Sequence, residues 1–215
     1  KGDLAVEFTI SEGFEDHERP VIAALYWEAF SAKLGRVMGP EHKALRFIAT
    51  QLDPKFALVA RNADGDVLGV AGYKTSHGAL IGGGLADLAR AYGWLSMLWR
   101  APLLALVERD LADDILLMDG ICVGPAARGM GLGSALLDAI KDTARALGLG
   151  AVRLDVIDTN PRAKALYERK GFVGIGEEDI GPLRWVFGFS ASTKMRCDVT
   201  PDAPTAHGHS RLNSA

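Results

Sequence analysis

The residues best suited to chemistry form a glycine-rich loop between an apolar strand and a helix. The loop GPAARGMGLGS follows a predicted strand that ends at Val123 and precedes a predicted helix over 131–147. The first N–H groups of a helix lack intrahelical acceptors and bind anions, and glycines let the backbone come close to phosphate oxygens. Arg128 adds a positive charge beside them. The segment therefore predicts a phosphate site, with positive φ at some of its glycines.

Two other phosphate-binding loops fit this segment poorly. No lysine follows the glycines as in GxxxxGK[ST], and the spacing GMGLGS differs from the GxGxxG of dinucleotide-binding folds. A glycine-rich turn without a ligand is the remaining alternative. Five glycines lie between Gly120 and Gly133, and they cost backbone entropy that a binding site would explain.

A second segment, LDVIDTNPRAKALYERKGF, follows the first along the chain. It predicts a strand and then a short helix with Asn160 as N-cap and Pro161 at the first helical position. The loop sequence RGMGLG resembles the RxxGxG/A motif of the GNAT superfamily of acyl-CoA-dependent N-acyltransferases. The strand end ICVGP and the second segment resemble the neighbouring motifs of that family, in the same order.

The resemblance implies an α/β (α+β) fold in which helices flank a mixed, twisted central sheet. It covers one domain over residues 4–197. Residues 198–215 contain almost no large apolar side chains and are predicted to form a disordered tail. Residues 85–108 depart from the simplest family members, because their apolar spacing predicts an extra helical insert.

Hydrophobic periodicity and turn residues predict the order of elements along the chain. Helices are expected over 16–37, 41–51, 131–147 and 161–171. Strands are expected over 4–10, 56–60, 67–75, 114–123, 151–157, 171–176 and 184–190, the last with an alternative end at Arg196.

Acetyl-CoA as co-substrate and a primary amine as acceptor are what the resemblance implies. The loop N–H groups would bind the CoA pyrophosphate, and the strand end would pair through its main chain with the pantetheine arm. The expected CoA-binding residues are Ile121, Cys122, Val123, Arg128, Gly129, Met130, Gly131, Leu132, Gly133, Ser134, Asn160 and Lys164. A solvated helix lysine is the alternative for Lys164.

In this family the transfer is direct. A neutral amine attacks the thioester carbonyl, a main-chain N–H near Val123 meets the oxyanion, and Tyr167 matches the acid that protonates the departing thiolate. Asp119 is the candidate base, because a two-residue period places it on the strand face of Ile121 and Val123. A core aromatic is the alternative for Tyr167, and a carboxylate bonded to backbone is the alternative for Asp119.

Other residues have a chemical and a structural interpretation. Cys122 could form an acyl-enzyme, but it has no identifiable partner base, and a buried core cysteine is expected. Asp155 alternates with the apolar residues of its strand and is a weaker candidate base. The acids 177–179 either line the acceptor mouth or lie in a solvated turn.

Aromatic residues of the first helix and of the insert are candidates for the acceptor pocket: Tyr26, Trp27, Phe30, Trp94 and Trp99. Packing in the core or between two subunits is the alternative. The insert over 85–108 is thus expected either to cover the site or to form a homodimer interface. The acceptor itself, a small molecule or a peptide amine, matches no motif in the sequence.

Composition excludes several other classes of protein. With 24 Lys and Arg against 27 Asp and Glu, the formal charge is −3, so a nucleic acid partner is not expected. The most apolar stretch, 85–107, is interrupted by charges, and its uncharged run of nine residues is shorter than the roughly 20 residues of a membrane span. Two cysteines favour a reduced, cytoplasmic setting, and the five scattered histidines predict no metal site.

The sequence therefore predicts an N-acetyltransferase. A catalytically silent CoA-binding regulatory protein of the same fold is the main alternative. A helix-rich interaction module, suggested by the tryptophans of the insert, is a third interpretation and would have no affinity for CoA.

Overall fold

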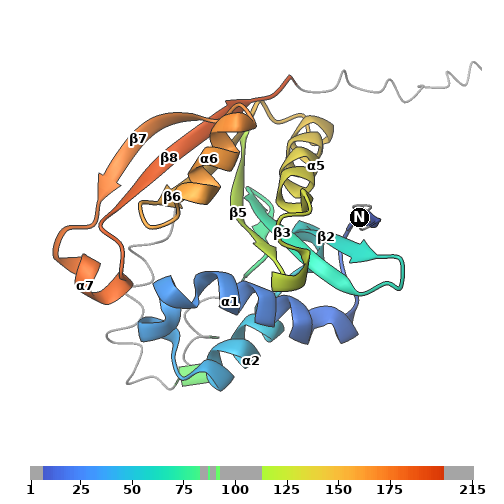
Figure 1. The fold of residues 1–215 in the computed structure, drawn as a ribbon, viewed down its shortest axis with the longest axis horizontal. Helices are drawn as coiled ribbons and strands as arrows, with labels where there is room; N and C mark the ends of the chain where they lie inside the picture. The colour runs from blue at the N-terminus through green and yellow to red at the C-terminus, as the bar shows by residue number, and fades with distance from the viewer. Residues whose placement is uncertain (1–6, 83–86, 88–90, 93–112, 201–215) are drawn as a thin grey trace, which may run out of the picture.

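A computed structural model gives the fold of residues 7–82, 87, 91–92 and 113–200 (Figure 1). The first part of the chain forms β1 (Phe8–Glu12), α1 (Arg19–Met38), α2 (Glu41–Gln51), β2 (Ala57–Asn62), β3 (Val67–Thr75) and the short β4 (Gly78–Ala79). The second part forms β5 (Ile115–Val123), α5 (Leu132–Ala146), β6 (Ala151–Ile157), α6 (Pro161–Arg169), β7 (Val173–Asp179), α7 (Arg184–Phe187) and β8 (Ala191–Asp198). Single 3₁₀ turns precede α1, β2, α5 and α7.

The strands form one sheet in the order β1-β2-β3-β5-β6-β8-β7, with β4 paired to β3. Neighbouring strands are antiparallel except β5 and β6, which are parallel. This parallel pairing spans only three positions, from Ile115 opposite Ala151 to Leu117 opposite Arg153. Beyond Leu117 the two strands are no longer paired, so a gap opens between their carboxyl ends.

Helices cover both faces of the sheet (Figure 1). On one face, α1 and α2 pack around Ile22, Ile48 and Val70. On the other face, α5 packs around Ile140 and Leu154, and α6 adds partly buried residues to this core. The sequence explains both layers, because α5 repeats its buried residues at helical spacing while β6 buries every second residue.

The predicted fold class, a mixed α/β sheet flanked by helices, is confirmed. The helix α2 and the strands β3 and β6 have the bounds that the sequence predicts. At the carboxyl end, β8 includes Asp198 and Val199 is buried, so the packed chain continues past Cys197. Of the predicted insert, only Asp87, Ala91 and Tyr92 are described, and the tail over 201–215 lies outside the described residues.

The predicted strand over 184–190 is wrong. Arg184–Phe187 form the single helical turn α7, which Gly188 closes with a φ of 75° and an N–H donated to the Arg184 carbonyl. The bulky run RWVF is typical of a strand, but here it forms a helical turn whose last residue, Phe187, is buried, and Phe189 just after the turn is buried as well. The strand that pairs with β6 begins only at Ala191.

Candidate active site

The glycine loop has the backbone conformation that its sequence predicts. Gly129 and Gly131 have φ values of 81° and 78°, in the region that side chains rarely adopt. A Cβ added at either position would meet nothing within 4 Å, so conformation and not space requires glycine there. Gly131 is the N-cap of α5, and the N–H groups of the next turn have no intrahelical acceptors. This loop can therefore accept an anion.

Main-chain groups at the end of β5 face the gap. The Gly124 N–H donates to the carbonyl of Leu68, near the start of β3, at 2.9 Å. Because hydrogen bonding alternates along an antiparallel strand, the N–H and C=O groups of Ile121 and Val123 point away from β3. They are thus placed to pair with an extended ligand that enters between β5 and β6.

Helix α6 closes the same region from the other strand. A Cβ added at Gly133, in the first turn of α5, would lie 3.6 Å from Leu166 and 4.0 Å from Val123. The end of β5, the start of α5 and the middle of α6 therefore meet at one place. Tyr167, the next residue on α6, packs against the core with its ring 6.0 Å from that of Phe172.

The other α6 residues have clear structural roles. The Asn160 side chain accepts the Ala163 N–H at 3.2 Å, which confirms the predicted N-cap. Lys164 donates to the Thr193 hydroxyl of β8 at 3.5 Å. The end of α6 is tied to α5 by an ion pair between Lys170 and Asp138, which the sequence motifs did not indicate.

Arg128 lies across the end of β5. Its Nε donates to the Val123 carbonyl at 3.2 Å, and its Nη2 lies 2.7 Å from the Glu28 carboxylate of α1. Glu28 was not among the predicted site residues. It lies 100 positions from Arg128, so no local motif could indicate this contact.

Asp119 lies at a β-bulge, so the two-residue period that predicts its strand face does not apply to it. Gly72 of β3 pairs with Gly120 and Tyr73 with Met118, so Asp119 is the extra residue of β5. The bulge interrupts the two-residue alternation, since Met118 and Ile121, three positions apart, pack in the same core. Counting back from Ile121 and Val123 therefore does not give the face of Asp119.

Asp155 alternates as predicted. Leu154 and Val156 are buried in the core beneath α5, whereas Asp155 is only partly buried. It lies on β6 two residues beyond the last pair with β5, at the edge of the gap. Asp155 is therefore a second carboxylate near the place where the strands separate.

Cys122 is a core residue. Its side chain is buried in the layer beneath α1, where burial, and then the charge of Glu28, raise the pKa of the thiol to about 12. A thiol with this pKa is protonated at neutral pH and is a poor nucleophile. The structure supports the buried cysteine over the acyl-enzyme.

The acids of β7 lie on an exposed edge strand. Glu178 pairs with Lys194 of β8 at 3.1 Å, and the Asp179 carboxylate accepts the Gly181 N–H at 2.6 Å. Both contacts are typical of a solvent-exposed edge strand and of the turn that follows it.

The aromatic residues of α1 divide into two groups. Trp27 is 9% exposed and belongs to the core, whereas Tyr26 and Phe30 are partly buried with ring centroids 4.5 Å apart. The Phe30 ring lies against Gly120, beside the bulge. Trp94 and Trp99 lie outside the described residues.

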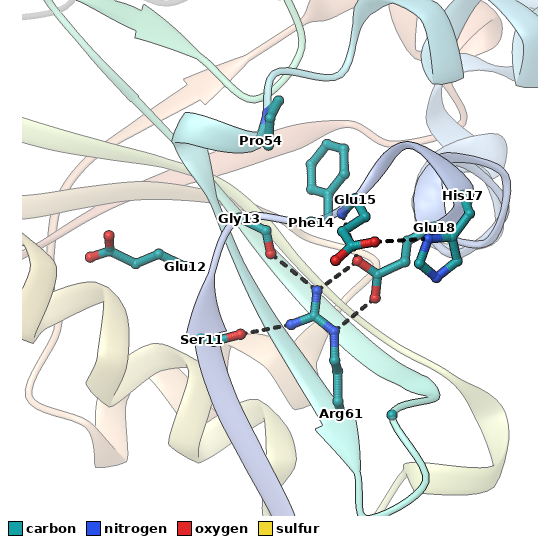
Figure 2. Close-up of a pocket in the computed structure, with 10 residues that line it drawn as sticks. Ser11, Glu12, Gly13, Phe14, Glu15, His17, Glu18, Pro54 and Arg61 are labelled. Carbon is teal, nitrogen blue, oxygen red and sulfur yellow. Dashed lines mark hydrogen bonds and ion pairs between the residues drawn. The ribbon is translucent and has the colours of Figure 1, made fainter.

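A separate pocket of about 570 Å³ lies where β1, β2 and the start of α1 meet. Figure 2 shows that Arg61 lies in the wall of this pocket and donates hydrogen bonds to Glu18, the Ser11 hydroxyl and the Gly13 carbonyl. These bonds hold β2 to β1 and to the turn before α1, which is a structural role.

Two features are absent from the described part of the chain. No helix there is long and apolar enough to cross a bilayer. No group of three or more His, Cys, Asp or Glu side chains there could hold a metal ion.

A mixed sheet with parted parallel strands and a glycine loop at the start of a helix are the features that the comparison with known families concerns. The family described as "Acetyltransferase (GNAT) family" matches residues 20–172, which is more than half of the chain. The chain therefore belongs to the GNAT family. It matches none of the curated proteins with which it was compared.

Solved structures have the same fold. A GCN5-related N-acetyltransferase from Kribbella flavida is 21% identical, with a TM-score of 0.61 over 89% of this chain and 98% of the other. A structure from Corynebacterium glutamicum, described as histone acetyltransferase HPA2 and related acetyltransferase, is 22% identical, with a TM-score of 0.62 over 92% and 98%. The ribosomal-protein-S18-alanine N-acetyltransferase from Escherichia coli is 17% identical, with a TM-score of 0.56 over 94% and 100%. At these identities the likeness establishes the fold alone.

Proposed function

We propose that this protein transfers an acetyl group from acetyl-CoA to a primary amine of a small molecule or a peptide. The observation that carries the proposal is the meeting of three elements at one gap. The main chain of Ile121 and Val123 faces it, the first turn of α5 opens beside it, and α6 borders it through Leu166, the residue before Tyr167. This arrangement suits a long ligand with a phosphate at one end and a reactive thioester at the other.

The donor would lie along β5. Main-chain groups of Ile121 and Val123 would bond the amides of the pantetheine arm, and the N–H groups from Gly129 to Ser134 would bind the pyrophosphate. Holding the thioester in this way aligns its carbonyl for attack and removes much of the entropic cost of a two-substrate reaction.

The chemistry needs one base and one acid. Asp119 would take a proton from the acceptor ammonium, directly or through a water, so that the neutral amine attacks the thioester carbon. A main-chain N–H near Val123 would stabilise the oxyanion. The nitrogen then gives its extra proton to water and the C–S bond breaks. Tyr167 would protonate the departing thiolate, a contribution of about 10²- to 10⁴-fold for general acid catalysis.

The test is turnover by the wild-type chain and by Tyr167→Phe. We expect acetyl-CoA to bind and at least one amine of a broad panel to accelerate thiol release. Tyr167→Phe should lower turnover at least tenfold and leave the Kd for acetyl-CoA close to wild type. Binding without turnover with any amine would favour the silent CoA-binding alternative, and no binding at all would refute both.

The proposal also includes a location in the cell and an oligomeric state. The two cysteines, Cys122 and Cys197, are free thiols, which suits the cytoplasm. A homodimer through the insert over 85–108 stays a prediction, because most of that segment lies outside the described residues.

A further inference from the structure

Arg128 occupies groups that the proposed donor would need. Its Nε donates to the Val123 carbonyl, one of the two carbonyls that face the gap and would bond the pantetheine arm. Its Nη2 pairs with the Glu28 carboxylate. Nε and Nη2 of the guanidinium are thus both engaged by the protein itself.

Glu28 reaches this place because α1 packs against the end of β5. A Cβ added at Gly124 would lie 3.5 Å from Leu25, one turn before Glu28. The Glu28 charge is also close enough to raise the pKa of Cys122. The side chains of Arg128 and Glu28 are 58% and 46% exposed, so water and a ligand can both reach the pair.

We propose that Glu28 and Arg128 form a latch over the end of β5, which the acyl-CoA donor opens when it binds. The inference rests on the proposed function and concerns how that same site is regulated. A pantetheine amide N–H replaces Arg128 Nε on the Val123 carbonyl, and the pyrophosphate replaces Glu28 as the anion beside Arg128. Glu28 then opposes donor binding in two ways, by holding the guanidinium and by repelling the phosphates.

The latch predicts that Glu28→Gln lowers the Kd for acetyl-CoA, although the substitution removes an ion pair at the site. Exposed ion pairs contribute about 0.2–1 kcal/mol, so releasing this one should lower the Kd for acetyl-CoA about 1.4- to fivefold. Arg128→Ala should raise that Kd. In the Arg128→Ala background, Glu28→Gln should lower the Kd less than it does in the wild-type background, because only the repulsion of the phosphates is then relieved; a matched charge control gives the effect of net charge alone. Asp142→Asn is that control, since Asp142 pairs only locally with Arg145 on α5 and the change in net charge is the same.

Pantetheine, a fragment of the donor, distinguishes the contact of Arg128 with the Val123 carbonyl from its proposed contact with the pyrophosphate. Pantetheine has the amides but no pyrophosphate, so Arg128→Ala should strengthen its competition with acetyl-CoA while weakening acetyl-CoA itself. Weaker competition in the variant, or none from pantetheine in either protein, would overturn the latch.

Titration calorimetry with acetyl-CoA distinguishes failure of the latch from failure of the proposed function. If wild type binds acetyl-CoA and Glu28→Gln matches Asp142→Asn, the latch is refuted and the proposed function stands. If wild type binds no acetyl-CoA, both are refuted.

Discussion

The ring of Phe30 occupies the space that a side chain at Gly120 would need. A Cβ added at Gly120 would lie 2.3 Å from Phe30 Cζ and 3.0 Å from Cε2. Tyr26 braces the ring from the preceding turn of α1. Helix α1 therefore rests directly on β5 next to the bulge at Asp119, and the absence of a side chain at Gly120 is what permits this contact.

Gly120→Ala should consequently displace α1 or distort β5. We expect a loss of about 1–3 kcal/mol in the free energy of unfolding, the usual cost of overpacking, together with reduced turnover. Phe30→Leu in the Gly120→Ala background should restore part of both, because it removes the atoms that collide. Urea unfolding and thiol-release assays measure the two effects. Gly176→Ala is the control, since a Cβ there meets nothing within 4 Å; equal losses at both positions would contradict the prediction.

Cys122 should resist thiol reagents in the folded protein. Its buried thiol has a pKa raised to about 12, so little thiolate exists between pH 7 and 9. Cys197, which is only partly buried, should react first and serves as the internal comparison. Mass spectrometry after timed alkylation would show the order. Cys122→Ala should keep most of the turnover, and loss of all activity with normal folding would revive the acyl-enzyme.

Features set by neighbouring residues could be predicted from the sequence. The left-handed glycines of the loop and the Asn160 cap are local, because each depends on φ preferences or on a side chain that reaches three residues. The bulge at Asp119 could not be predicted, since it exists only through the register of β5 against β3. The same holds for the contact between Glu28 and Arg128, which requires the packing of α1 on the sheet.

The helical turn α7 could not be predicted from local propensity. Trp, Val and Phe in the run RWVF favour a strand by propensity, yet the run forms a helical turn whose last residue, Phe187, is buried. Tertiary packing overrides local preference in a segment this short. The candidate donor residues were therefore predictable by motif, whereas the faces and partners of the charged residues required the fold.

The two carboxylates near the gap should differ in their effect on rate. Asp119 is the proposed base, so Asp119→Asn should lower kcat/KM by about 10²- to 10⁴-fold. Asp155→Asn should lower kcat/KM less. The Kd for acetyl-CoA should stay near wild type in both variants. A larger loss of kcat/KM in Asp155→Asn than in Asp119→Asn would assign the base to Asp155 of β6.

The Glu18–Arg61 pair should make stability depend on acid pH. Glu18 is 6% exposed, and its two carboxylate oxygens accept hydrogen bonds of 2.7 Å from Arg61 (Figure 2). These bonds, which outweigh burial, hold the pKa of Glu18 below its ordinary value of 4.5. Because the folded-state pKa is the lower one, the stabilisation is fully present above pH 4.5 and is lost as the pH falls through the folded-state pKa.

Glu18→Gln tests this dependence. The charged hydrogen bonds are worth about 1.5–3 kcal/mol, so the variant should lose roughly that much in the free energy of unfolding at pH 7. The difference from wild type should shrink as the pH falls, because protonated Glu18 resembles Gln. Asp16→Asn is the control: its carboxylate also pairs with an arginine, Arg19, but is 91% exposed, so it should change stability little at any pH. Urea titrations in steps from pH 7 to pH 3 would measure both variants, and a difference between Glu18→Gln and wild type that stays constant over this range would show that the pair contributes no pH-dependent stability.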